Sequence, residues 1–167
     1  ANPREGAKLV VAEAARNVGN LAMLRDVSKA VEFYRKALAA EPSHTETARL
    51  LGQALILVGD LRGADAAYNE ALRVAKEHGD QWAVMAAHIG LGEVFQKSRD
   101  LSAAKKSFTA ALRIPNRLQK ADPAATYLQR DIALALDRIG NVMAAQGDGR
   151  GALGSFRKGL ALREQAL

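Results

Sequence analysis

Few residues of this chain have types and spacings that could perform chemistry. The most recognisable string is Gly149-Arg150-Gly151-Ala152-Leu153-Gly154, which matches the G-x-G-x-x-G pattern that binds the pyrophosphate of dinucleotides. That pattern works between a strand and a helix of a βαβ unit. Here a long helical pattern precedes the glycines, which coincide with a turn and the first turn of a following helix. We therefore interpret the string as a helix start and not as a nucleotide site.

Metal and nucleophilic chemistry have little support either, because the chain contains three histidines and no cysteine. His44 falls in an expected turn and His78 near an expected helix end, so we expect both in solvent. His88 occupies a helix position that favours a half-buried structural role, and no serine or carboxylate pair stands beside it as a catalytic partner would. A metal ion would need further ligands that the pattern lacks. We expect no enzyme activity, no metal, no cofactor and no small-molecule substrate.

Basic residues outnumber acidic ones, 24 to 18, and the excess lies in the second half of the chain, chiefly between Lys105 and Arg130. Such a surface could attract an acidic partner or nucleic acid. The simplest interpretation of Lys105 and Lys106 is a solvated face of a helix. Nucleic-acid binding stays an alternative function, although Phe108, the ring beside Lys105 and Lys106 in the sequence, is already used by the repeat for packing.

The composition favours a helical, soluble protein. Hydrophobic residues make up 49% of the chain and aromatic residues only 5%, so alanine-rich helix formers dominate. No apolar run reaches the roughly 18 residues of a membrane-spanning helix. The lack of cysteine is compatible with a cytoplasmic or a periplasmic protein, and of the two we favour the cytoplasm.

A repeated pattern organises the chain. Each copy begins with Asp and continues with Ala four residues later, an aromatic ring eight residues later and Leu twelve residues later. The aspartates are Asp26, Asp60, Asp100 and Asp148. The alanines are Ala30, Ala64, Ala104 and Ala152. The rings are Tyr34, Tyr68, Phe108 and Phe156, and the leucines are Leu38, Leu72, Leu112 and Leu160. Eight residues before the Asp, three copies have Gly52, Gly92 and Gly140, whereas the first copy has Val18 after Asn17.

These positions predict four helix–turn–helix hairpins. The aspartates would cap the second helices, the alanines would allow close packing, and the rings would fill the space between hairpins. Pro42 would end the first hairpin, and Ser43 with Glu46 would form a capping box for the next helix. In the longer third spacing we expect one helix to stop near Arg113 and the next to run from about Pro123 to Gln146.

The pattern resembles the tetratricopeptide repeat family, most fully at Leu51, Gly52, Ala64, Tyr68 and Ala71. The spacing between capping aspartates grows from 34 to 40 and 48 residues, similar to the longer repeats of kinesin light chain and of Leu-Gly-Asn polarity adaptors. The resemblance implies an all-α fold, a right-handed superhelical stack of about four hairpins. It implies a single domain over residues 1–167, with repeats at about 11–44, 45–84, 85–132 and 133–166 and with residues 1–10 extending the first helix.

In that family the first helices line a concave groove that binds segments of other proteins. Carried over by position, the resemblance implies a groove lined by Arg16, Arg49, Gln53, Ile56, Glu93, Lys97, Asp137, Arg138 and Asn141. The same carry-over adds Glu46, Ile89, Gln96 and Met23 to the lining. We choose Arg49, Arg138 and Asn141 as anchors for a partner peptide or amphipathic helix.

The expected function is therefore that of a protein–protein interaction scaffold, which the sequence suggests to be bacterial. The first alternative is self-assembly through the C-terminal helix, where some of Leu153, Phe156, Leu160 and Leu167 are expected to be uncovered. The second alternative is nucleic-acid binding through the basic residues between Lys105 and Arg130.

Overall fold

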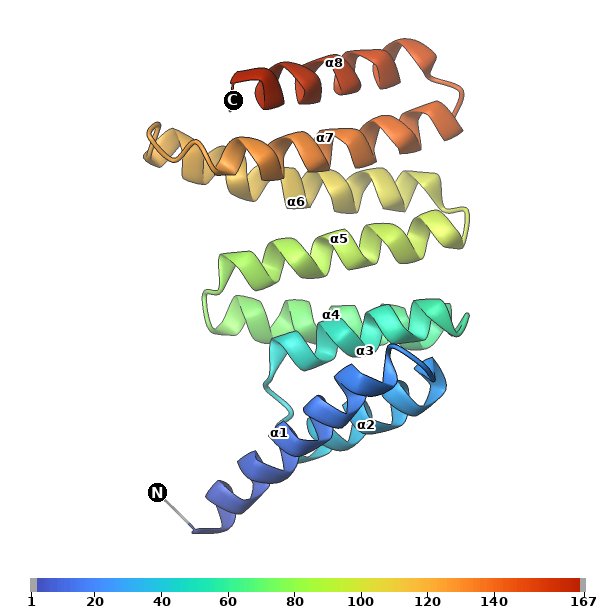
Figure 1. Cartoon of the computed structure of the whole chain (residues 1–167). Coiled ribbons are helices and arrows are strands. Elements are labelled where there is room, and N and C mark those ends of the chain that lie inside the picture. The colour runs from blue at the N-terminus through green and yellow to red at the C-terminus, as the bar shows by residue number, and fades with distance from the viewer. Residues whose placement is uncertain (1–2, 166–167) are drawn as a thin grey trace. The chain divides into compact units, whose positions relative to one another are not determined.

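The computed structural model describes residues 3–165, and every regular element in that range is an α-helix (Figure 1). The helices are α1 (Pro3–Ala22), α2 (Val27–Ala40), α3 (Thr45–Leu57), α4 (Leu61–Glu77), α5 (Gln81–Lys97), α6 (Leu101–Ala121), α7 (Leu128–Ala145) and α8 (Gly149–Gln165). They pack as sequential hairpins, about four helix pairs, which confirms the predicted all-α fold. The handedness of a stack and its division into repeats stay predictions.

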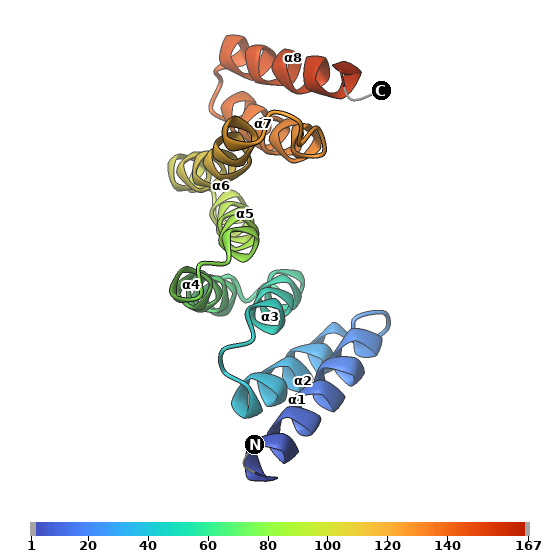
Figure 2. The ribbon, with the colours of Figure 1, turned by 90° about the vertical axis from the view of Figure 1, so that its left-hand side faces the viewer.

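The chain forms two compact units, which we describe separately. Unit 1 is Ala1–Gly90 and unit 2 is Leu91–Leu167, so the division falls within α5. In unit 1, α1 packs on α2, α2 on α3 and α3 on α4. In unit 2, α6 packs on α7 and α7 on α8, and the turned view in Figure 2 shows each of these helix pairs side by side.

Small residues at the helix contacts allow this close packing. In unit 1, Ala48, Ala71 and Ala87 from three successive helices form one buried cluster. Among the largest fully buried side chains of the molecule are the rings Tyr34 and Phe108. All four repeated alanines and the rings Tyr34, Tyr68 and Phe108 are buried, as their spacing predicts, whereas the fourth ring, Phe156, is only partly buried.

The four capping aspartates are confirmed. The carboxylate of Asp26 accepts a hydrogen bond from the Lys29 amide at 3.1 Å, and Asp60 accepts one from Gly63 at 2.8 Å. The remaining two accept bonds of 2.9 Å from Ala103 and Gly151. Each second helix begins one residue after its Asp. Such a cap stabilises a helix by about 1 kcal/mol.

Three of these aspartates follow a residue with left-handed backbone, namely Gly59 (φ 84°), Arg99 (φ 65°) and Gly147 (φ 83°). This geometry ends the preceding helix, because the amide of the Asp then reaches a carbonyl five residues back. The Asp60 amide, for example, donates to the Leu55 carbonyl at 2.9 Å.

The first turn is built differently, and this corrects the alignment of the first copy. The Asp26 amide donates to Ala22, only four residues back, and no left-handed residue precedes it. Gly19 precedes its Asp by seven residues instead of eight, so it takes the place that the even spacing gave to Val18. A Cβ on Gly19 would lie 2.7 Å from Cε1 of Tyr34, just as one on Gly52 would lie 2.7 Å from the ring of Tyr68.

Two predicted helix boundaries are wrong. His44, not Ser43, caps α3, because its ring nitrogen accepts the Thr47 amide, and Glu46 turns to Arg49 instead of closing a capping box. Further along, α6 does not stop near Arg113 but runs to Ala121 with Pro115 inside it.

The helix continues through Pro115 because its packing outweighs the local cost. A proline inside a helix forfeits one backbone hydrogen bond and costs about 3 kcal/mol. Pro115 is fully buried and Ile114 nearly so, which holds this turn in place. Asp122 then ends α6, and its carboxylate accepts the Ala124 amide at 3.1 Å in a turn, so Pro123 does not start a helix.

The first helices of the last two pairs start at Gln81 and Leu128. The turn before α5 has the same structure as the turns before the second helices. Gly79 has left-handed backbone (φ 69°), and the Asp80 carboxylate accepts a hydrogen bond from the Ala83 amide at 2.9 Å. At the other end, α1 extends back to Pro3.

Candidate binding surfaces on the first helices

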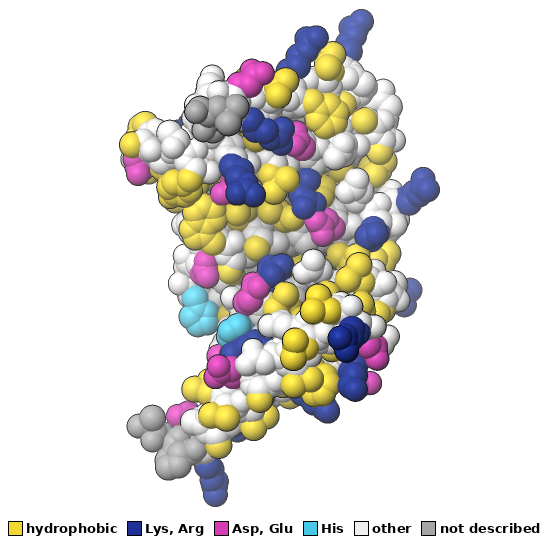
Figure 3. Space-filling view, viewed as in Figure 1, with side chains coloured by type: hydrophobic (Ala, Val, Ile, Leu, Met, Phe, Trp, Pro, Cys, Tyr) yellow, Lys and Arg dark blue, Asp and Glu magenta, His cyan; other side chains and the backbone are white. Residues whose placement is uncertain are grey.

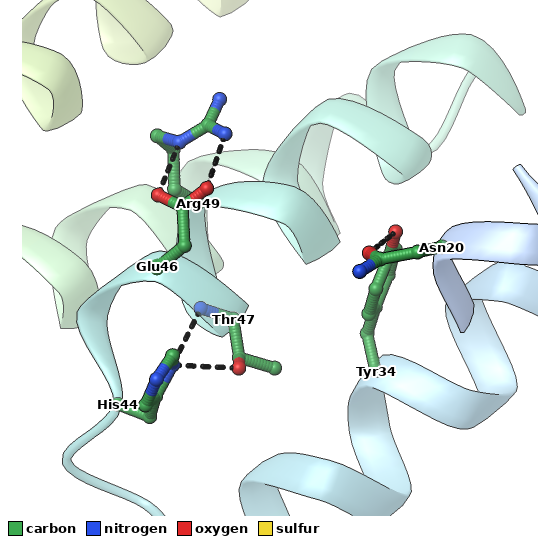
Figure 4. Close-up of polar contacts among 6 residues, drawn as sticks. All are labelled: Asn20, Tyr34, His44, Glu46, Thr47 and Arg49. Atoms are coloured by element: carbon green, nitrogen blue, oxygen red, sulfur yellow. Dashed lines mark hydrogen bonds and ion pairs between the residues drawn. The ribbon is translucent and has the colours of Figure 1, made fainter. Parts of the chain in front are cut away.

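Aromatic rings hold the first helices of unit 1 in place. Tyr68 lies between Gly52 of α3 and Gly90 of α5, where an added Cβ would come within 2.7 Å and 2.2 Å of its ring. Tyr34 lies against Gly19 and donates its hydroxyl proton to Oδ1 of Asn20 at 2.9 Å (Figure 4). Burial raises the pKa of the Tyr34 hydroxyl. Ring packing therefore fixes the positions of the first helices, which carry the candidate side chains.

His44 and Thr47 form the start of α3 (Figure 4). Nδ1 of His44 accepts from the Thr47 amide at 3.1 Å and lies 2.8 Å from the Thr47 hydroxyl, which is fully buried. An amide always donates, so Nδ1 carries no proton in this arrangement and the tautomer is the Nε2–H form. His44 is thus a structural cap and not the solvated turn residue that its position suggests.

The predicted anchor Arg49 is already engaged within α3. Its Nε and Nη2 donate to the two carboxylate oxygens of Glu46 at 2.7 Å and 2.6 Å, a forked pair drawn in Figure 4. This hydrogen bonding by Arg49 lowers the pKa of Glu46, against the opposing effect of burial. A carboxylate of a partner would have to displace Glu46 to take the same fork.

The remaining predicted residues of unit 1 differ in exposure. Arg16 donates to Glu41 at 2.5 Å, which ties α1 to the end of α2, and both side chains are about a fifth exposed. Gln53 is exposed. Ile56 is only 9% exposed, so it belongs to the core and does not offer the apolar surface expected of it.

In unit 2 the predicted anchor Arg138 is a packing residue. Its guanidinium carbon lies 5.7 Å from the centre of the Phe108 ring, and Nη1 forms an ion pair with Glu93. Arg138 comes two residues before Gly140, as Gly90 comes two residues before Gly92. This position contacts the ring of the preceding hairpin, a role that Gly90 plays against Tyr68. The repeat pattern places both Arg138 and Glu93 on an open surface and does not reveal their contact.

Asp137 and Asn141 face a groove between α7 and α8 of about 550 Å³. Asp137 forms an ion pair with Arg163 of α8, and Asn141 is exposed. The α7–α8 groove is lined by Asp137, Asn141, Leu153, Phe156, Arg157, Leu160 and Arg163. Leu153 and Leu160 are 49% and 53% exposed, as the sequence analysis predicts for this helix, while Leu167 lies outside the described residues. Figure 3 shows hydrophobic and basic side chains together over α8.

The other chemically suggestive residues have structural roles. Burial, and secondarily Lys76, lowers the pKa of His88. The His78 ring lies 2.9 Å from the Val74 carbonyl at the end of α4. Gly151 has no room for a side chain, since a Cβ would lie 2.1 Å from Cε of Met143, and its amide is used by Asp148. Lys97, in the last turn of α5, is exposed.

The described residues contain neither a candidate metal cluster nor a candidate membrane-spanning helix. Between residues 3 and 165, no group of three His, Cys, Asp or Glu side chains has an arrangement suited to a metal ion. None of the helices in the same range combines the length and the apolar character needed to span a membrane.

The chain is similar to known proteins in structure. No protein-family model and no curated protein sequence matches the chain. The crystal structure of MamA matches with a TM-score of 0.66 at 19% identity, over 92% of this chain and 79% of MamA. BtubC (BKLC) from P. vanneervenii matches with a TM-score of 0.75 at 20% identity, over 96% of this chain and 63% of BtubC. The apo form of RapI matches with a TM-score of 0.78 at 17% identity, over 95% of this chain and 57% of RapI.

The fold is tetratricopeptide-like. At these identities the likeness concerns the fold alone, and the chain spans less than two thirds of the BtubC and RapI chains.

Proposed function

We propose that this protein is an interaction scaffold that binds an amphipathic helix of another protein in the α7–α8 groove. The observation that carries the proposal is the composition of this groove. Two half-exposed leucines, Leu153 and Leu160, line it beside Asp137 and Asn141, two residues that the sequence independently assigns to a partner-binding surface. An apolar centre with a polar border is the usual composition of a site that holds a helix.

The chain itself suggests the shape of the occupant. Phe108 lies against Gly92 of its own hairpin, and the following first helix, α7, covers the ring through Arg138. Phe156 is the equivalent ring in α8, and it lies against Gly140. A helix fits beside Phe156 as α7 fits beside Phe108, with a small or a long flexible residue over the ring.

Charge at the border favours a particular helix. Arg157 and Arg163 line the groove, and Arg163 already neutralises Asp137. The groove therefore has a positive balance, and an occupant with acidic residues next to its apolar stripe complements it.

The other first-helix residues would contribute unequally to partner binding. Arg16, Arg49 and Glu93 are held in internal ion pairs, so a partner would have to replace those contacts. Gln53 and Lys97 are exposed and could be contacted without that cost. We therefore expect Asn141, which is exposed and lines the α7–α8 groove, to matter more for binding than Arg49.

Site-specific crosslinking tests the proposal. A photo-crosslinking amino acid in place of Leu160 should form a discrete adduct with one protein in native cell extract. The same amino acid in place of Arg35, an exposed residue of α2, serves as the control and should not. Adding Leu153→Asp should abolish the adduct at position 160, because a carboxylate in the apolar centre opposes helix docking.

The outcomes separate the candidate functions. An adduct with a second copy of the chain, together with a mass that rises with concentration in sedimentation, would establish self-assembly through α8 instead. Equal adducts at positions 160 and 35, or no effect of Leu153→Asp, would contradict a specific groove.

A further inference from the structure

The positive charge of the protein belongs entirely to unit 2. Residues 1–90 contain 11 basic and 11 acidic residues, whereas residues 91–167 contain 13 basic and 7 acidic ones. The net charge of +6 is therefore that of unit 2. A field of one sign over half of a small protein raises the local concentration of ligands of the opposite sign.

Most acidic side chains of unit 2 are already used internally. Asp100 and Asp148 cap helices, and Asp122 holds the turn after α6. Glu93 and Asp137 pair with Arg138 and Arg163. Five of the seven carboxylates thus have partners within the unit, so they are not available to neutralise the lysines of α6.

A polar groove on α6 collects these lysines. The α6 groove, as we name it, has a volume of about 590 Å³ and is lined by Ser102, Lys105, Lys106, Thr109, Arg113 and Gln146. The five residues of α6 recur at intervals of three and four, so they lie on one face of the helix. Gln146, at the end of α7, forms the other wall. Three cations line this groove and no carboxylate does.

The groove offers donors for an anion. Ser102, Lys105, Lys106, Arg113 and the Gln146 amide can all donate hydrogen bonds. The Thr109 hydroxyl donates to the Lys105 carbonyl at 2.7 Å, so its proton is already committed. Recognition would therefore rest on the three cations with help from two neutral groups.

We propose that the α6 groove binds an acidic segment of a partner protein, in extended conformation, through its Asp or Glu side chains. From Lys105 to Arg113 the helix rises about 12 Å. Carboxylates four residues apart in an extended chain are separated by about 13 Å. An acidic segment can thus meet both ends of the groove at once, and Lys106 lies on the same face between them.

The lining favours a peptide over nucleic acid. None of the lining residues is aromatic, and Phe108, the ring nearest in sequence, is fully buried. Single-stranded nucleic acid gains much of its affinity from stacking on exposed rings. Three cations without such a ring can bind carboxylates, but they contribute little to the binding of nucleic-acid bases.

The α6 groove shares no lining residue with the α7–α8 groove. The two proposals therefore stand independently, and the failure of either leaves the other untouched.

Binding of a labelled peptide with Glu at alternate positions, measured by fluorescence anisotropy, tests the site. The peptide in which Gln replaces Glu should bind at least about tenfold more weakly. The variant Lys105→Gln/Lys106→Gln/Arg113→Gln should weaken binding of the Glu peptide about tenfold or more. The matched control is Lys120→Gln/Arg130→Gln/Lys158→Gln, which removes the same charge from exposed positions of unit 2 and should change affinity less than about threefold.

Other results would overturn the proposal. Equal losses in the two triple variants would mean that only the general field attracts the peptide. Tighter binding of a single-stranded oligonucleotide of equal charge, lost in the groove variant, would assign the groove to nucleic acid. Circular dichroism checks the fold, and Lys106→Gln alone, at an exposed position, provides a milder variant that should weaken binding in the same direction.

Discussion

The guanidinium of Arg138 lies over the ring of Phe108, 5.7 Å from its centre, while the same side chain forms an ion pair with Glu93. One residue thus connects α7 to both α5 and α6 within unit 2. It combines the apolar contact that the repeat requires at this position with a charge–ring attraction and an ion pair.

Replacing Arg138 should therefore destabilise unit 2. Arg138→Ala removes the contact with the ring and leaves Glu93 half-buried without its partner, at an expected cost of about 1–3 kcal/mol in the free energy of unfolding. Urea denaturation measures it. Glu93→Gln in the Arg138→Ala background should recover part of the loss, since no unpaired charge remains, and an Arg138→Ala variant as stable as the parent would contradict this role.

Two glycines in helices should respond in opposite directions to the same change. Gly90→Ala places a methyl group 2.2 Å from the Tyr68 ring and should destabilise the protein by about 1–3 kcal/mol. Gly154→Ala is the control, because nothing lies within 4 Å of its new Cβ, and it should stabilise α8 by about 0.5–1 kcal/mol. Thermal unfolding of both variants decides the matter, and a shift of the same sign in both would refute the packing of Tyr68.

The cap of α3 predicts a graded response at His44. His44→Ala removes the acceptor of the Thr47 amide and should cost about 1 kcal/mol. His44→Asp supplies a carboxylate at the same helix start and should restore or exceed the original stability, because negative charge is favoured there. Urea midpoints of the two variants test it, and equal midpoints would mean that the cap contributes nothing.

His88 predicts a dependence of stability on pH. Its pKa is lowered in the folded protein from the ordinary value of 6.5, so the unfolded chain binds the proton more readily. The stabilising contribution of neutral His88 is therefore fully present above pH 6.5. It is lost as the pH falls from 6.5 toward the folded pKa. Unfolding free energies measured between pH 7 and pH 5 should decline less for His88→Gln than for the parent, and an equal decline in the two proteins would contradict this role of His88.

The helical hairpins could be predicted because their signals are local. A capping Asp acts on an amide three residues away, and the small and aromatic positions recur on one face of a helix. The turn before α5 gives the same local signal, the dipeptide Gly79-Asp80. The longer spacing between the second and third capping aspartates makes this signal harder to recognise.

The errors arise where tertiary packing overrides the local rule. Pro115 breaks a helix by its own chemistry, but burial keeps α6 intact. Even spacing misaligns Gly19, because the first copy has one residue fewer between its Gly and its Asp. The pattern places Arg138 on an exposed face, because a single copy does not reveal which ring its side chain covers.

The packing of each helix on its neighbours in the chain also has a kinetic consequence. Contacts between α1 and α2, α3 and α4, or α7 and α8 close only short loops, so little chain entropy is lost before the first contacts form. Proteins dominated by such contacts fold in microseconds to milliseconds. We therefore expect refolding to start independently within separate hairpins.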